Sequence, residues 1–156
     1  MATRSILLRT GDARDIATID ALMAAAFDPR YGEAWTRGQS LGVMAMPGVR
    51  LTLAMIDETP AGFTLVRSVA DEAELLLIAV APPYRRHGIA TALLRGVIAD
   101  AQGSGIATLH LEVREGNEAV VLYVANGFAR VGERRNYYRG KTGHAFDAHT
   151  YRRDLR

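Results

Sequence analysis

The sequence contains no cysteine, and this absence excludes several kinds of chemistry. Disulfide bonds, thiolate metal ligands and a cysteine nucleophile cannot occur in such a chain. Long apolar segments are missing as well, since the longest run, Leu75 to Pro83, is far shorter than the ~18 residues of a membrane-spanning helix. The opening segment, MATRSILLRTGDARD, lacks the apolar core and cleavage site of a secretory signal. We therefore expect a soluble, cytoplasmic protein that does not act at a membrane.

Linkers and internal repeats are also absent from the 156 residues. A chain of this length corresponds to about one domain and buries roughly two thirds of its unfolded surface. Its 49% hydrophobic and 23% charged residues are typical of a globular protein. We expect residues 1–156 to form a single domain.

Charge is distributed unevenly along the chain. Residues 130–156 carry eight basic and three acidic side chains, a net charge of +5, whereas residues 1–129 have a net charge of −3. A basic segment suits an anionic or RNA-rich partner, but it also occurs on solvated edges of proteins. Because aromatic residues do not interleave with the basic ones at regular spacing, we expect no direct nucleic-acid binding.

Hydrophobic periodicity predicts a mixed α/β sheet with about seven strands and four helices. Asp12 and Asp15 resemble a capping box at the start of the first helix. The segment 74–81 is apolar on both faces, which is typical of a central strand covered on both sides. We expect strands at 4–10, 50–56, 61–67, 74–81, 108–113, 128–135 and 145–155, and helices at 13–28, 35–44, 88–103 and 118–125.

The central segment LLLIAVAPPYRRHGIATALL carries the main chemical signal. A buried strand leads into a loop, and the loop leads into a helix whose free backbone amides and dipole favour phosphate oxygens. Gly88 and Ala90 leave room for an anion, and Arg85 and Arg86 can add charge-assisted contacts. The alternative is an ordinary strand–helix connection. Neither the P-loop pattern nor the dinucleotide fingerprint G-x-G-x-x-G is present.

A carboxylate in a predicted strand is the second signal. Strand alternation places Thr108, His110 and Glu112 on one face. A charged side chain in a central strand either takes part in chemistry or forms an ion pair, here with Arg114 or a neighbouring strand. The four histidines lack metal-ligand spacing, so we expect no metal site.

The segments IAVAPPYRRHGIATALL, LHLEVREGN, LYVANGF and RRNYY together closely resemble the GNAT family of acetyl-CoA-dependent N-acetyltransferases. Within that family the chain looks like the RimI-type enzymes, which acetylate the N-terminal alanine of a small-subunit ribosomal protein. The resemblance covers residues 4–155 and is sharpest from Glu72 to Tyr138. It implies the GNAT fold, acetyl-CoA as co-substrate and the N-terminus of an acceptor protein as partner.

The resemblance also implies roles for individual residues. The main chain around Ile78 and Val80 should contact the pantetheine arm, with the Val80 amide polarising the thioester carbonyl, and the amides of residues 86–91 should hold the pyrophosphate. The residues expected at the cofactor are Ile78, Ala79, Val80, Arg85, Arg86, His87, Gly88, Ile89, Ala90, Thr91 and Asn117.

Two residues match the family's catalytic pair. Glu112 corresponds to the general base and Tyr123 to the acid that protonates the departing thiolate, although Tyr123 is also the kind of aromatic that packs in a core. Tyr137 and Tyr138 correspond to positions that close over the acceptor, with a plain strand edge as the alternative. Trp35 either lines the acceptor groove or has a packing role.

The chain departs from the family pattern at two positions. The spacing from Asn117 to Tyr123 is six residues, whereas RimI-like enzymes usually have seven. One residue corresponds to about 100° of rotation on a helix. Either the preceding loop absorbs this rotation or Asn117 no longer reaches the cofactor. His110 stands where these enzymes often have Trp.

Three functions remain open at this stage. The first is acetylation of a protein N-terminus, which is chemically undemanding because an α-amine with a pKa of ~7.7–8.0 loses its proton far more readily than a lysine. The second keeps the cofactor but uses a small-molecule amine as acceptor. The third is a CoA-binding or RNA-associated module without catalysis. Without a cysteine for an acyl intermediate, catalysis would proceed by direct attack in a ternary complex.

Overall fold

The structure is a computed structural model that describes residues 5–156. Its strands are β1 (Ile6–Gly11), β2 (Val49–Ile56), β3 (Thr59–Val69), β4 (Glu72–Val80), β5 (Thr108–Arg114), β6 (Ala129–Arg139) and β7 (Ala145–Asp154). Its helices are α1 (Ile16–Ala26), α2 (Arg37–Met44), α3 (Ile89–Gly103) and α4 (Val120–Ala125). The strands form one sheet in the order β1-β2-β3-β4-β5-β7-β6. The predicted mixed α/β sheet with seven strands and four helices is therefore confirmed for the described residues.

Local sequence signals explain where the first two helices begin. Asp12 and Asp15 form the predicted capping box, and a short helical turn, Ala13–Asp15, precedes α1. The second helix begins at Arg37 rather than at residue 35, because Thr36 forms a capping box with Gln39. The amide of Gln39 donates to the Thr36 hydroxyl over 3.1 Å. Residue 4, predicted to begin the first strand, lies outside the described residues.

Two predicted boundaries in the second half of the chain were wrong. The helix predicted at 118–125 begins at Val120, because the Asn117 side chain accepts a hydrogen bond from the amide of Ala119 and holds the chain in a turn. The strand predicted at 128–135 continues to Arg139, because β6 bulges after Arg134 and then pairs with β7 again at Tyr138. Both differences arise from contacts that local periodicity does not contain.

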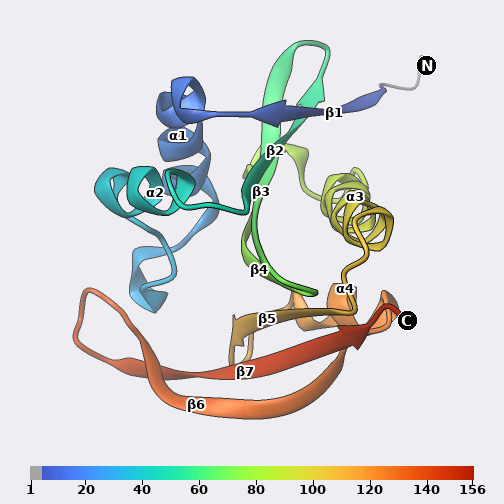
Figure 1. Cartoon of the computed structure of the whole chain (residues 1–156). Helices are drawn as coiled ribbons and strands as arrows, with labels where there is room; N and C mark the ends of the chain where they lie inside the picture. Colours follow the sequence, from blue (N-terminus) through green and yellow to red (C-terminus); the bar gives the residue numbers. More distant parts are fainter. Residues whose placement is uncertain (1–4) are drawn as a thin grey trace.

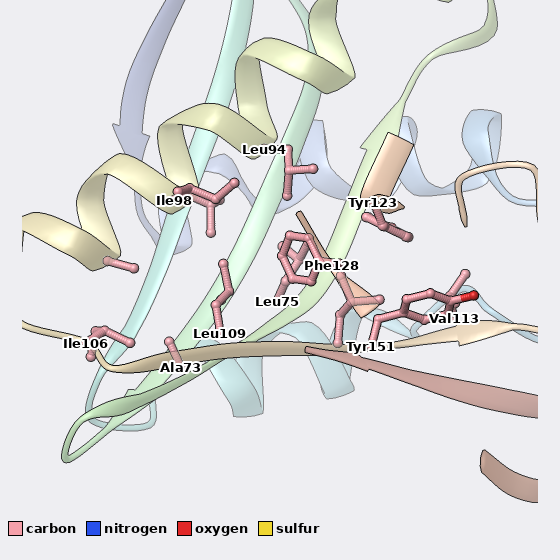
Figure 2. Packing of buried hydrophobic residues seen from close by; sticks show 13 residues of the cluster. Ala73, Leu75, Leu94, Ile98, Ile106, Leu109, Val113, Tyr123, Phe128 and Tyr151 are labelled. Carbon is pink, nitrogen blue, oxygen red and sulfur yellow. The ribbon is translucent and has the colours of Figure 1, made fainter. Parts of the chain in front are cut away.

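The sheet separates two helical layers (Figure 1). On one face α1 packs over β2, β3 and the second half of β4 around Ile19, Leu22 and Met23. On the other face α3 and α4 cover β5 and the first half of β4. Figure 2 shows Leu94 and Ile98 pointing from α3 towards Leu109 of β5. Because β4 is covered on both faces, its apolar sequence is explained, as predicted.

A β-bulge in β4 changes the direction of the strand at the centre of the sheet. Leu75 and Leu77 lie opposite successive residues of β3, so Leu76 is an extra residue. After it the side chains change face: Leu75 belongs to the core beneath α3, and Leu77 to the core beneath α1. The parallel pairing of β4 with β5 also ends at Leu75. Bulges bend a strand and end its pairing, so the second half of β4 presents an edge that β5 does not cover.

Candidate active site

The loop between β4 and α3 has the shape of an anion-binding site. Arg86 and Gly88 both have left-handed backbone conformations, with φ of 65° and 77°. The first hydrogen bond of α3 runs from the amide of Ala92 to the carbonyl of Gly88 over 3.0 Å. The amides of residues 89–91 therefore precede the helical ladder and lie at the positive end of the helix dipole. Such an arrangement suits phosphate oxygens.

The uncovered edge of β4 supplies two further main-chain donors. The amide of Ala81 donates to the carbonyl of Ala61 in β3 over 2.9 Å. Since successive amides of a strand point in opposite directions, the amides of Val80 and Ile78 point away from β3. β5 does not pair with β4 at these positions. Ala79, between them, turns its side chain into the core beneath α1.

The two arginines of the loop have different surroundings. The Arg85 guanidinium donates to the carbonyl of Ala26, at the end of α1, over 2.8 Å, and to that of Val80 over 3.4 Å. It therefore ties the end of α1 to the end of β4. Arg86 and His87 are exposed beside the start of α3. The helix start and the free strand edge both present main-chain donors that the fold does not use.

Glu112 is a buried carboxylate on β5. Its side chain is 8% exposed, and Oε1 lies 3.1 Å from Nε of Arg134 on β6. Thr150 of β7, directly opposite Glu112 in the register, donates its hydroxyl to Oε2 over 2.8 Å. The contact with Thr150 comes from the adjacent strand β7, and the contact with Arg134 comes from β6, the next strand beyond it.

One tyrosine lies against Glu112, and a second lies near Glu33. Tyr138 donates its hydroxyl to the main-chain carbonyl of Glu112 over 3.3 Å. Tyr123, on α4, is buried and meets Phe128 edge to face at 6.0 Å between ring centroids. Burial, followed by the negative charge of Glu33, raises the pKa of both phenols well above the usual value. Each phenol therefore keeps its proton throughout the neutral pH range.

Glu33, which the sequence analysis did not identify, joins this group from the segment between α1 and α2. Its Oε1 accepts a hydrogen bond from Nε of Arg114 over 3.2 Å, and its Oε2 accepts one from the side-chain amide of Asn117 over 3.1 Å. The Arg114 guanidinium also lies 3.7 Å from the ring centroid of Tyr31. No local pattern marks Glu33 as functional, because its partners are more than eighty residues away along the chain.

The side chain of Asn117, which was expected to contact the cofactor, forms two hydrogen bonds within the protein. Its carbonyl oxygen accepts from the amide of Ala119 over 2.9 Å, and its amino group donates to Glu33. The six-residue spacing from Tyr123 is thus accommodated by a turn before α4. The structure brings Asn117 together with the acidic and phenolic groups of the site.

Of the residues expected to bind the acceptor, Tyr137 and Tyr138 contact each other beside Glu112, whereas Trp35 lies at a separate cavity. Tyr137 is 48% exposed, and its ring meets that of Tyr138 edge to face at 4.9 Å between centroids. Trp35 packs against the core beneath α1 and also lines a cavity of about 370 Å³. The other residues lining this cavity belong to α2, and neither Glu112 nor Tyr123 is among them. The cavity therefore does not contain the buried carboxylate and phenol.

Two glycines allow the segment before α2 to touch the turn between β6 and β7. A Cβ on Gly32 would overlap the carbonyl of Arg139, and one on Gly140 would overlap the carbonyl of Arg30. The amide of Lys141 donates to the carbonyl of Pro29 over 3.3 Å. Figure 1 shows these two segments next to each other at one end of the molecule. Their main chains form a bridge beside the site.

Residues 5–156 contain neither a cluster of metal ligands nor a membrane-spanning helix. Within residues 5–156, no group of three or more His, Asp or Glu side chains is arranged to hold a metal ion. No helix in that range is long and apolar enough to cross a membrane.

Comparison with known proteins connects this geometry to a family. Residues 18–128 match the model of the acetyltransferase (GNAT) family. An N-alpha-acetyltransferase RimI from Mycobacterium tuberculosis is 35% identical over 152 residues, which cover 94% of this chain and 89% of that protein. A ribosomal protein bS18-alanine N-acetyltransferase from Escherichia coli strain K12 is 47% identical over 79 residues. That match spans 50% of this chain and about half, 53%, of the relative.

The overall structure is also similar to a solved one. The crystal structure of the ribosomal-protein-S18-alanine N-acetyltransferase from Escherichia coli superposes with a TM-score of 0.86 at 28% identity, covering 97% of this chain and 94% of that one. The chain therefore belongs to the acetyltransferase (GNAT) family and is similar to its RimI-type members.

Proposed function

We propose that the protein is an acetyl-CoA-dependent N-acetyltransferase that modifies the N-terminal alanine of a ribosomal protein. The observation that carries this proposal is the buried carboxylate of Glu112 next to the protonated phenol of Tyr138, which in turn neighbours the buried phenol of Tyr123. A carboxylate and a phenol in one site can accept one proton and donate another, which is what transfer of an acyl group to an amine requires.

The cofactor is held mainly by main-chain groups. The amides of residues 86–91 and the Arg86 side chain bind the pyrophosphate, and the free edge of β4 at Ile78 and Val80 binds the pantetheine arm. Acetyl-CoA supplies an acetyl group activated as a thioester. The amide of Val80 donates a hydrogen bond to the thioester carbonyl and polarises it.

Glu112 and Tyr123 carry out the two proton transfers of the reaction. Glu112 accepts a proton from the α-ammonium of the acceptor, directly or through a water molecule, so that the neutral amine attacks. Tyr123 carries a proton on its phenol oxygen at neutral pH, and it donates this proton to the leaving sulfur. The absence of cysteine from the chain excludes an acyl-cysteine intermediate, so the amine attacks the thioester directly.

The names of two relatives support the proposed acceptor. The proteins from Escherichia coli and Mycobacterium tuberculosis carry names that specify alanine or α-amine acetylation. Tyr137, Tyr138 and Trp35 are proposed to line the groove for the acceptor N-terminus. The same assignment places the protein in the cytoplasm, where ribosomal proteins are made.

Mass spectrometry of acetyl transfer to two peptides of equal charge tests the proposal. One peptide has a free N-terminal alanine, and the other has a blocked N-terminus and an internal lysine. We expect acetylation of the first peptide alone. Acetylation of neither, with acetyl-CoA still bound in a calorimetric titration, would overturn the protein acceptor and favour a small-molecule amine, which a polyamine panel would then identify.

A further inference from the structure

The carboxylate of Glu33 connects three separate parts of the chain. It lies in the segment between α1 and α2, Arg114 ends β5, and Asn117 lies in the turn before α4. The side chains of Glu33 and Arg114 are only 11% and 12% exposed. Removal of one partner from a buried ion pair leaves an uncompensated charge, so such contacts strongly resist separation.

The Asn117 side chain is directed to this carboxylate by its own turn. Its carbonyl oxygen is fixed by the amide of Ala119 at 2.9 Å, and its main-chain amide donates to the carbonyl of Arg114 over 3.1 Å. With the carbonyl fixed, the planar amide group must present its amino group on the opposite side, where Oε2 of Glu33 accepts at 3.1 Å. The main-chain amide of Ala119 therefore fixes the orientation of the Asn117 side-chain amide group.

Glu33 in turn belongs to the side of the site that receives the acceptor. Its segment forms the bridge with the turn between β6 and β7 through Pro29 and Lys141. Its charge is among the causes that raise the pKa of Tyr123 and Tyr138, so the carboxylate lies close to both phenols. A displacement of Glu33 would therefore change the surroundings of both phenols.

We propose that Arg114 and Asn117 are positioning residues that clamp Glu33, and with it the segment between α1 and α2, against β5 and α4. In this protein Asn117 acts on the acceptor side of the site and is not a ligand of the cofactor. The inference rests on the proposed function, because it assumes that the phenols and Glu112 surround the transferred acetyl group. It concerns this chain specifically, since the shortened spacing from Asn117 to Tyr123 accompanies the turn that directs the amide to Glu33.

The decisive variant is Asn117→Asp. The new side chain retains an oxygen that can accept from the amide of Ala119, but it loses the donor to Glu33 and brings two negative charges together. We expect the KM for the alanine peptide to rise about tenfold or more, as for loss of a hydrogen bond to a charged group. The dissociation constant of acetyl-CoA, measured by calorimetry, should change less than twofold.

A second substitution tests whether the contact itself is responsible. Adding Glu33→Gln to the Asn117→Asp variant restores complementarity, since the glutamine amino group can donate to the introduced carboxylate while its carbonyl accepts from Arg114. We expect the double variant to recover most of the peptide KM. Asp28→Asn is the matched control, because it weakens an exposed ion pair with Arg30 on the same segment and should leave both constants unchanged.

Hydrogen exchange supplies a readout that does not depend on turnover. In Asn117→Asp the amides of residues 31–36 should exchange faster than in the unmodified protein, and the double variant should restore their protection. If peptide acetylation fails with the unmodified protein, the proposed function is wrong, and hydrogen exchange still decides whether the clamp exists. Weaker acetyl-CoA binding in Asn117→Asp, not restored by Glu33→Gln and without faster exchange, would overturn the inference and make Asn117 a cofactor ligand.

Discussion

Thr150 and Glu112 face each other across β5 and β7, and the threonine hydroxyl donates to the carboxylate over 2.8 Å. The other carboxylate oxygen lies 3.1 Å from Arg134, whose side chain is 63% exposed. One oxygen is thus held by a group inside the sheet and the other by a group that solvent reaches. The carboxylate is therefore oriented by Thr150 on the adjacent strand β7 and by Arg134 on β6, the next strand beyond it.

The first prediction concerns the two proton-transfer groups. Glu112→Gln and Tyr123→Phe should each lower kcat by about 100-fold or more, since a positioned acid or base typically contributes 10²–10⁴-fold. The acetyl-CoA dissociation constant should stay within twofold, because main-chain amides provide most of the expected contacts. Steady-state kinetics and calorimetry measure the two quantities. Full activity in both variants would show that the roles are assigned to the wrong residues.

The second prediction separates the two arginines of the loop before α3. Arg86→Gln should weaken acetyl-CoA binding severalfold, with a loss that shrinks as salt is added, because the contact with the diphosphate is electrostatic. Arg85→Gln should instead lower the free energy of unfolding by about 1 kcal/mol, through its lost hydrogen bonds to Ala26 and Val80. Calorimetric titration and urea unfolding distinguish the two effects. A reversed pattern would place Arg85 at the cofactor.

The third prediction concerns the bridge between the segment before α2 and the turn between β6 and β7. Gly140→Ala would push the main chain away from the carbonyl of Arg30. We expect a higher KM for the alanine peptide, a lower melting temperature and unchanged acetyl-CoA binding. Gly103→Ala is the control, because its Cβ meets nothing within 4 Å and it lies at the end of α3. Unchanged peptide kinetics in Gly140→Ala would show that the bridge does not shape the acceptor groove.

The fourth prediction concerns stability at alkaline pH. Burial raises the pKa of Tyr123 and Tyr138 in the folded protein above the value of about 10 for an unfolded chain. Above that value the unfolded chain loses these protons while the folded protein keeps them, so the free energy of unfolding must fall as pH rises. Below about pH 10 the tyrosines are protonated in both states, so they cause no loss in the free energy of unfolding. Urea unfolding at pH values from about 9 to 11 should show this fall, and Tyr123→Phe should make it shallower; an identical slope would contradict the prediction.

Local sequence allowed the central part of the site to be predicted. The two-sided apolar pattern of residues 74–81 and the glycine at residue 88 lie next to each other in the chain, and β4, the loop and the start of α3 formed where they were expected. Capping at Asp12 and Asp15 was predictable for the same reason, because a helix start is determined by side chains within one turn. Strand alternation likewise placed Glu112 on the face away from the core beneath α3.

Other parts of the site had no local signal. Leu76 is one apolar residue in an apolar run, and only the pairing with β3 makes it a bulge. The partners of Glu112 come from β6 and β7, which the chain reaches after α4. Glu33 lies in a segment without periodicity, and its contacts with Arg114 and Asn117 exist only once the sheet has formed.

The sequence by itself determined the class of fold, the position of the loop between β4 and α3 and the strand face on which Glu112 lies. These features depend on residues that are neighbours in the chain or alternate along one strand. The tertiary structure alone decided that Glu33 holds Asn117, that Arg85 ties the end of α1 to the end of β4, and that two glycines bring distant segments together. Each of these contacts joins residues far apart in the chain, and packing selects such pairs by shape and charge after the elements have formed, so no spacing in the sequence encodes them.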